Sequence, residues 1–432
     1  MAQPAGLSFE QAPPFSQPLR FFLTAPLFLL AAAGLLVWAP EALASRWTPQ
    51  ALALTHALTL GFLAMSMLGA LTQMLPVVAG ASLPAPRLVS GFSHAALVGG
   101  TVALMTAFLT ARPAAFAIAV MLLGGGFAGF LAAATLSLAR AVASATVGGM
   151  RLALASLGVT VLLGLALALM RAGVWTPPAV EAAMTAHVTF GLLGWVLLLV
   201  IGVAWQVVPM FQITPPYPPW LSRRLAATLF ALLLLHASAP MLPAVVARLV
   251  DAGLAGGILL FAFATLRLLA RRRRKLPDAT HDYWRLGMAS LIACVLVWLV
   301  AQIRPAWADG DAYPLMLGVL FIGGFAVSVV NGMLYKIVPF LAWFHLQAQL
   351  QARAGSIPTM KDMIAERSTR AQFRMHLGAC ALLVAGLFWP QLVRVAGMML
   401  ALSASLLWIN LLSAARRFSR HGGRFGYRSG TN

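Results

Sequence analysis

Long apolar stretches alternate with short polar links along the whole chain. There are twelve such stretches, centred near residues 30, 65, 100, 127, 162, 196, 232, 258, 293, 326, 382 and 404. Apolar stretches of about 20 residues are long enough to cross a lipid bilayer as helices. The two longest runs are expected to divide, one near Pro240 and Pro243 and the other near Pro390, because proline interrupts a helix. The pattern therefore predicts an all-α polytopic membrane protein with about 12 transmembrane helices.

The second, sixth and tenth stretches end in similar motifs, "TQMLPVV", "WQVVPMF" and "YKIVPFL". Their prolines, Pro76, Pro209 and Pro339, are 133 and 130 residues apart, which is a period of four helices. Regular spacing of this kind indicates internal repeats. We predict one membrane domain of three parallel four-helix repeats in a pseudo-threefold arrangement, and we expect each proline to end its helix. The repeats cover roughly residues 20–140, 150–270 and 283–415.

Each motif also places a long polar side chain three residues before its proline, namely Gln73, Gln206 and Lys336. In one interpretation, these side chains snorkel to the membrane interface or cover backbone carbonyls that the proline frees. In the other, they form a polar inner vestibule that lines a path or binds an anionic group. His94, His345 and His376 would lie near that vestibule. The sequence leaves both interpretations open.

Basic residues are distributed unevenly between the two sides of the predicted bundle. The chain has 432 residues, is 61% hydrophobic and 9% charged, and has a formal net charge of +20. Most Lys and Arg fall on the side that both termini share, including "RRRRK" at 271–275 and the tail after Ala415. The positive-inside rule makes this side cytoplasmic. We predict a multi-pass protein of a bacterial-type inner (plasma) membrane, with both termini in the cytoplasm. Its basic runs are expected to contact anionic lipid and not nucleic acid.

One polar insert, residues 346–371, interrupts the apolar pattern on the same side. It is the longest polar segment in the chain. Its start is expected to continue the tenth helix, and the remainder is predicted to be a cytoplasmic loop or an amphipathic surface helix.

Six of the eight histidines lie within predicted helices, where ionisable groups are costly and usually functional. Their depths define an outer tier of His56, His187 and His236 and an inner tier of His94, His345 and His376. Imidazole binds copper, zinc and haem iron, so both tiers are candidate cofactor or metal sites. Hydrogen-bonded core histidines are the alternative. No intramembrane Asp or Glu is expected beside either tier, which disfavours a carboxylate proton relay.

Twelve helices in three parallel units, with both termini inside, resemble subunit I of the haem–copper oxidase superfamily. The resemblance implies that His56 on helix 2 binds haem and that His187 on helix 6 and His236 on helix 7 bind copper. The 49-residue step from His187 to His236 is close to the family's spacing. The first two helices, "LRFFLTAPLFLLAAAGLLVW" and "HALTLGFLAMSMLGALTQMLPVVAG", are also similar to those of NnrS-type haem- and copper-containing membrane proteins linked to nitric oxide stress. The matching places are His56, Gly61, Phe62, Gly69 and Leu71.

The sequence departs from the oxidase pattern at several ligand positions. Oxidases carry paired His on helix 7, whereas His236 stands between Leu235 and Ala237. They carry two His on helix 10, whereas "LGVLFIGGFAVSVVNGMLYK" has none, and Gly191 stands where a Tyr follows the helix-6 His. A conventional terminal oxidase is therefore excluded. Haem b is the expected cofactor, with a second His, a Met or no residue as its second ligand, and copper is the second candidate.

Two function hypotheses of different classes follow. The first is a haem- and/or copper-binding membrane protein without oxidase chemistry, acting in electron relay with a donor or respiratory partner, or in nitric oxide or metal handling. The second is a transporter or channel for a small solute or metal, with the polar vestibule at its mouth. Parallel threefold repeats are less usual in transporters, which favours the first hypothesis. A structural assembly factor is a third option, and no catalytic residue is identified.

Overall fold

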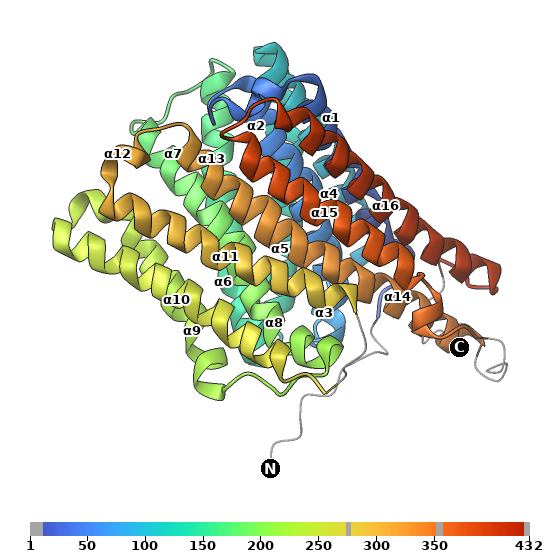
Figure 1. The fold of residues 1–432 in the computed structure, drawn as a ribbon. Helices are drawn as coiled ribbons and strands as arrows, with labels where there is room; N and C mark the ends of the chain where they lie inside the picture. Colours follow the sequence, from blue (N-terminus) through green and yellow to red (C-terminus); the bar gives the residue numbers. More distant parts are fainter. Residues whose placement is uncertain (1–11, 274–277, 351–356, 427–432) are drawn as a thin grey trace.

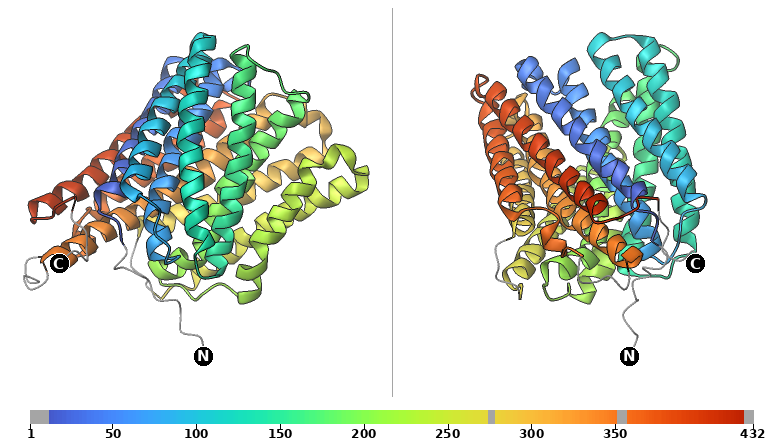
Figure 2. Two further views of the ribbon diagram at one scale, coloured as in Figure 1. Left: turned by 180° about the vertical axis from the view of Figure 1, so that it is seen from behind. Right: turned by 90° about the vertical axis from the view of Figure 1, so that its right-hand side faces the viewer.

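The structure is a computed structural model that describes residues 12–273, 278–350 and 357–426. It is a bundle of long helices that run in broadly the same direction with different tilts (Figures 1 and 2). Within the described residues, eleven helices are long and apolar enough to cross a membrane. The twelfth predicted span is α15 (Glu366–Gly386), which is more polar because Arg367, Arg370 and Arg374 lie in its first turns. It packs lengthwise against α16 (Leu392–Arg420). The all-α polytopic fold is confirmed.

The helices form three consecutive units of four. The first unit contains α1 (Ser16–Trp38), α2 (Pro49–His56) continuing into α3 (Met65–Val77), α4 (Pro86–Thr110) and α5 (Pro113–Ala139). The second contains α6 (Ala145–Arg171), α7 (Val180–Thr189) continuing into α8 (Leu198–Gln212), α9 (Pro219–Ala237) and α10 (Ala244–Ala270). The third contains α11 (Ala279–Ile303), the short α12 (Pro305–Ala308), α13 (Ala312–Gly318) continuing into α14 (Ser328–Leu350), α15 and α16. The predicted breaks near Pro240 and Pro390 are confirmed by the ends of α9 and α15.

The three units are assembled in the same way. In each, the first helix packs on the second, giving the pairs α1 and α3, α6 and α8, and α11 and α14. The third helix packs on the fourth, giving α4 and α5, α9 and α10, and α15 and α16. Contacts of α5 with α6, of α10 with α11 and of α16 with α1 close the units into a ring around the second helices. This arrangement is pseudo-threefold, as predicted.

The second helix of every unit contains a π-helical segment at an equivalent level. These segments are Ala57–Ala64, Phe190–Leu197 and Val319–Val327. Single π-helical turns are rare and are frequently found at functional sites. His56 comes directly before the first segment, and His187 lies three residues before the second. His56 and His187 therefore lie within one turn before the π-helical segments of their helices.

Two glycines in each second helix lie 15 and 7 residues before the motif proline. They are Gly61 and Gly69, Gly194 and Gly202, and Gly324 and Gly332. Each contacts the first helix of its own unit at close range. A Cβ atom on Gly324, for example, would lie 2.5 Å from Ser290 Oγ, and one on Gly202 would lie 2.9 Å from the Gly149 Cα. Small residues allow membrane helices to approach this closely, so the spacing encodes how the units pack.

Replacing Gly324 by alanine should lower stability by about 1–3 kcal/mol, because overpacking a close helix contact forces a backbone shift. The neighbouring Gly323 offers a matched control, since nothing lies within 4 Å of the Cβ that alanine would add there. The midpoint of thermal unfolding in detergent would fall for Gly324→Ala and stay near the parent value for Gly323→Ala. Equal midpoints for the two variants would contradict the packing account.

The prediction that each motif proline ends its helix is wrong for the third unit. Pro76 and Pro209 lie in the last turn of α3 and α8, but α14 continues past Pro339 to Leu350. Proline is tolerated inside membrane helices when neighbouring segments hold the backbone. The turns of α14 after Pro339 bury Leu341, His345 and Leu346, and this packing keeps them helical. The start of the insert at 346–371 is thus helical, as expected, while residues 351–356 lie outside the described residues.

The two ends of the described chain meet on one side of the bundle. The Ser16 backbone N–H donates to the Phe425 carbonyl at 3.2 Å, and the rings of Phe15 and Phe425 lie 6.1 Å apart. Phe15 also stacks on His345, six residues beyond Pro339, at 5.8 Å. We call this side the proline end and the opposite side the histidine end. Both chain ends therefore share a side, as an even number of crossings requires.

Candidate metal centre

His56 and His187 come together from two different units at the histidine end. Their ring centroids are 6.4 Å apart and their planes are inclined by 20°. His56 ends α2 and His187 lies in α7, so each side chain belongs to the outer part of a central helix. Phe108 of α4 lies against the other side of His56, with centroids 5.1 Å apart. The sequence placed these two histidines at one depth, and the structure makes them neighbours.

Each ring is oriented by a backbone carbonyl. His56 Nδ1 lies 2.8 Å from the Leu52 carbonyl, and His187 Nδ1 lies 2.9 Å from the Thr160 carbonyl of α6. A carbonyl only accepts, so Nδ1 carries the proton and Nε2 is left with a free lone pair in both rings. This is the tautomer that metal-binding histidines adopt when an outer partner holds them. Gly164 leaves room for the ring, since a Cβ there would lie 2.8 Å from His187 Cε1.

The spacing of the two rings allows both to reach one metal ion. Metal–nitrogen bonds are about 2.0–2.1 Å long, and a ring nitrogen lies roughly 1.1 Å from the ring centre, so two imidazoles on opposite sides of a metal have centroids about 6.3 Å apart. Bent ligation would bring them closer. The 6.4 Å separation of the two nearly parallel rings is therefore near the upper limit for a shared metal. Iron and copper are both metals that imidazole binds, so His56 and His187 are the residues that would hold either one.

His236, the third outer histidine, contacts a carboxylate. Its Nδ1 lies 2.6 Å from Asp251 Oδ1 of α10, and both side chains are about one-third exposed, at 28% and 33%. The expectation that no intramembrane Asp or Glu accompanies the tier is wrong, because Asp251 lies in the second turn of α10. The sequence has no pattern that would predict this partner, because Asp251 is a single carboxylate in an apolar span. Within the described residues, no group of three or more His, Cys, Asp and Glu side chains is placed to hold a metal ion.

The three inner histidines have separate surroundings. His94 lies 3.0 Å from Thr24 Oγ1 and packs edge-on to Phe21. His376 Nε2 lies 2.8 Å from Ser328 Oγ and 3.6 Å from Cys380 Sγ. His345 is fully buried, and neither ring nitrogen has a hydrogen-bond partner in the described part of the chain. Their suggested role in cofactor binding stays a prediction.

His376 belongs to a buried polar cluster in the third unit that the sequence did not reveal. The Tyr283 hydroxyl donates to Gln372, whose amide donates to Ser403 Oγ at 2.8 Å. The Asn410 amide donates to the Tyr335 hydroxyl at 2.9 Å. Comparison of the repeats would have found part of the cluster, because the first unit has apolar residues where the third has Ser328 and Tyr283. Counted from the motif proline, Ser328 corresponds to Met65, and Tyr283 packs on Gly332 as Phe21 packs on Gly69. Hydrogen bonds across helices stabilise packing within a membrane.

The three polar residues of the proline motifs do not share one environment. Gln73 is buried and its Oε1 has no partner in the described residues, whereas Gln206 is half-buried. Lys336 Nζ donates to Asp278 Oδ2 at 2.7 Å, and the two side chains are only 12% and 11% exposed. Asp278 also caps α11 by accepting from the Thr280 N–H at 3.0 Å. The Lys336 cation is thus neutralised internally, and an anion-binding role at a vestibule stays a prediction.

No family model matches the chain, and no curated protein matches it. A solved structure, the cryo-electron microscopy structure of a haem–copper terminal oxidase dimer, is similar to it. The TM-score is 0.65 at 12% sequence identity, and the match covers 93% of this chain and 84% of that chain. The chain has the haem–copper oxidase fold. The likeness at this identity concerns the fold, and the His56–His187 centre rests on the contacts of this chain.

The haem–copper oxidase fold explains why the second helices carry the candidate ligands. Side chains of α3, α8 and α14 line one shared space, and the π-helical segments Ala57–Ala64 and Val319–Val327 contact each other. Near the outer ends of two of the second helices His56 and His187 are neighbours, whereas His236 of α9 contacts Asp251 of α10. The third unit contributes no histidine at the equivalent level, where Leu317, Gly318 and Val319 lie at the end of α13 and the start of the following π-helical segment. Two of the three second helices thus carry an imidazole near this level.

Proposed function

We propose that this protein is a haem- or copper-binding integral membrane protein in which His56 and His187 hold one metal centre. The observation that carries the proposal is the pair of parallel imidazoles from two units, 6.4 Å apart. In both rings Nδ1 is bound to a carbonyl, so both Nε2 atoms are available. Two hydrogen-bonded core histidines would not need matched orientation from opposite helices.

Haem b is the first candidate for the bound group, and copper is the second. When bound there, either group would supply one-electron transfer or the binding of a small gas molecule. The residues of this chain have other tasks: Leu52 and Thr160 fix the ring orientation, and Gly164 leaves space for His187. His56 and His187 are half-buried among apolar helices, and an apolar setting favours a neutral imidazole, which is the ligand form. His236 with Asp251 resembles a carboxylate-oriented ligand, but its partner metal is left as a prediction.

A reduced-minus-oxidised optical spectrum of the purified full chain, combined with metal analysis, tests this function. A sharp visible α band with about one iron per chain is expected for haem. Bound copper without that optical band would identify copper as the bound group. Neither metal, in protein produced with ample haem and copper, would overturn the proposal and leave the transporter hypothesis. That hypothesis has less support, because Lys336 is paired and the space between the three central helices is apolar.

Gly164→Ala should disturb the centre without touching a ligand. The new Cβ would lie 2.8 Å from His187 Cε1 and 3.3 Å from Nδ1, so the ring must move away from the Thr160 carbonyl. Losing such an outer partner typically weakens metal binding by about 10- to 100-fold. Competition with a chelator would measure the change. Gly158 of the same helix is the control, because an added Cβ meets nothing within 4 Å there. Equal metal affinities of the two variants would show that His187 does not bind the metal.

The cellular setting follows from the charge pattern and is part of the proposal. We place the proline end in the cytoplasm of a bacterial-type inner membrane, because Arg271, Arg272 and the basic end of α16 lie there. Anionic lipids and an electron donor or respiratory partner are the proposed contacts. The likeness of the first two helices to NnrS-type proteins fits this setting and stays a prediction.

A further inference from the structure

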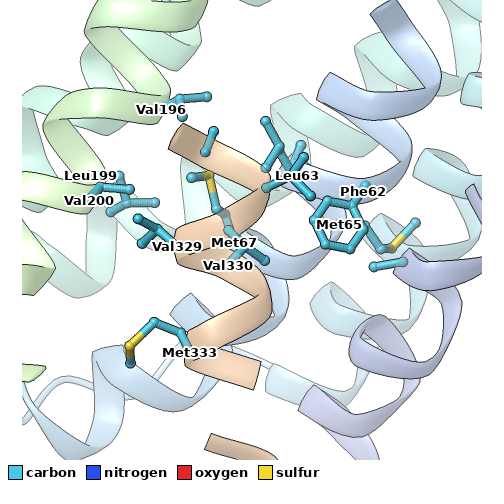
Figure 3. Packing of buried hydrophobic residues seen from close by; sticks show 14 of the residues in the cluster. Phe62, Leu63, Met65, Met67, Val196, Leu199, Val200, Val329, Val330 and Met333 are labelled. Carbon is cyan, nitrogen blue, oxygen red and sulfur yellow. The ribbon is translucent and has the colours of Figure 1, made fainter. Parts of the chain in front are cut away.

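A cavity lies among the three central helices, between the metal centre and the proline end. Its volume is about 80 Å³. Side chains of α3, α8 and α14 line it, with Phe22 of α1 and Trp284 of α11 beside them. Figure 3 shows Met67, Val200 and Val330 from the three helices facing one another at this place. Its accessible wall is apolar, because Ser66 Oγ and Trp284 Nε1, which belong to lining residues, are covered by neighbouring atoms.

The walls come from the same positions of each unit. Counted back from the motif proline, positions 10, 9, 6 and 2 are used in all three helices. They are Ser66, Leu199 and Val329; Met67, Val200 and Val330; Ala70, Val203 and Met333; and Met74, Val207 and Ile337. The cavity therefore lies on the pseudo-threefold axis and is a product of the repeat architecture.

Small side chains in the first unit keep this space open. Ser66 stands where the second unit has Leu199, and Ala70 stands where the third unit has Met333. Both larger residues are accommodated on the same axis in their own units. Protein interiors normally contain few voids larger than a water molecule, because lost contacts destabilise the fold. An axial space that two single substitutions would fill is thus a feature of this sequence.

The chemistry of the walls selects the occupant. One water needs about 10–15 Å³ of such volume and two to four polar partners. The cavity has room for several waters, but its accessible wall is apolar and half-enclosed by the helices, which favours an apolar guest over water. The surrounding bilayer dissolves small apolar molecules and supplies them to the helix bundle. We propose that the axial cavity is a binding site for a small, uncharged apolar molecule of the size of a dissolved gas.

This site is distinct from the proposed metal centre. Ser66, its nearest lining residue in the first unit, is ten residues beyond His56 along the helix. None of the lining residues is a histidine, and the inference holds whether or not a metal binds. Xenon is the probe, because it is apolar, gas-sized and visible by anomalous scattering.

Crystals of the full chain pressurised with xenon give a direct test. A xenon peak between Met67, Val200 and Val330 is the expected result. The proposal is overturned if the map shows no peak there while xenon occupies other sites in the same crystal. It is also overturned if ordered water or a lipid chain fills the space. The map of the wild-type protein therefore tests the proposed binding site without any variant.

Substitutions borrowed from the other units provide the matched comparison. Ser66→Leu and Ala70→Met introduce the residues that the second and third units have at equivalent positions. Both should abolish the axial xenon peak and leave the metal content unchanged. Leu136→Phe adds volume to a lipid-facing residue of α5, 55% exposed, and should retain the peak. If xenon were still bound at full occupancy in a crystal of Ala70→Met, the gas would bind at another place. That result would contradict the assignment of xenon to the axial cavity.

Discussion

Without the His187 imidazole, the protein should lose its bound haem or copper. Two residues that share one metal depend on each other, so His187→Ala and His56→Ala are both expected to reduce the metal content from about one per chain to near zero. The redox-dependent optical or paramagnetic signal should disappear with it. The physical reason is the geometry of the pair, in which each Nε2 is the free donor of an oriented ring.

Two other histidine variants make this result specific. His421→Ala changes an exposed residue at the end of α16 and should retain full metal content. His236→Ala removes a ring that is bound to Asp251, and unchanged content would leave the centre with two protein ligands. A folded His187→Ala protein that still carries stoichiometric metal would disprove the centre, whatever the spectrum of the parent protein.

Lys336→Met is expected to have the largest effect on stability. It leaves Asp278 as an unpaired carboxylate that is only 11% exposed, and removing one partner of a buried ion pair typically costs about 3–5 kcal/mol. The thermal midpoint in detergent should fall clearly. The metal content should not change, because Lys336 lies near the proline end and His56 and His187 lie at the opposite end.

The repeats supply a control for this variant as well. Gln206→Met removes the equivalent polar residue of the second unit, which is neutral and half-buried, and should cost much less because no charge loses its partner. Adding Asp278→Asn to Lys336→Met should restore most of the lost stability. Asparagine retains the cap on α11 and carries no charge. If the double variant were as unstable as Lys336→Met, packing of the lysine stem and not its charge would be responsible.

Sequence patterns predicted the parts of this fold that depend on apolar length. Twelve stretches gave twelve helices, and the breaks at Pro240 and Pro390 fell where expected. The motif period predicted the three units, because each second helix must meet the others at the axis. Pro339 shows the limit: the sequence could not show that residues beyond it are buried and keep α14 helical.

Side-chain partners were predicted less well than helices. Depth along a helix placed His56 and His187 at one level, but the angle around each helix, which decides that they face each other, depends on packing between units. Asp251 and Asp278 were overlooked because a single carboxylate in an apolar span or at its edge has no pattern of its own. The glycines 15 and 7 residues before each motif proline are visible in the sequence. Their spacing would have predicted the close contacts between the first and second helices of each unit.

The junction of Ser16 with Phe425 has a consequence for how the polypeptide is connected. Since the first and last described helices are already in contact at one end of the bundle, a short peptide can join them. New ends can then be opened in the link between α5 and α6, at residues 140–144, without cutting a helix. Such a circular permutant would be synthesised with the second unit first and the first unit last. The order in which the units enter the membrane is therefore separable from the ring that they form.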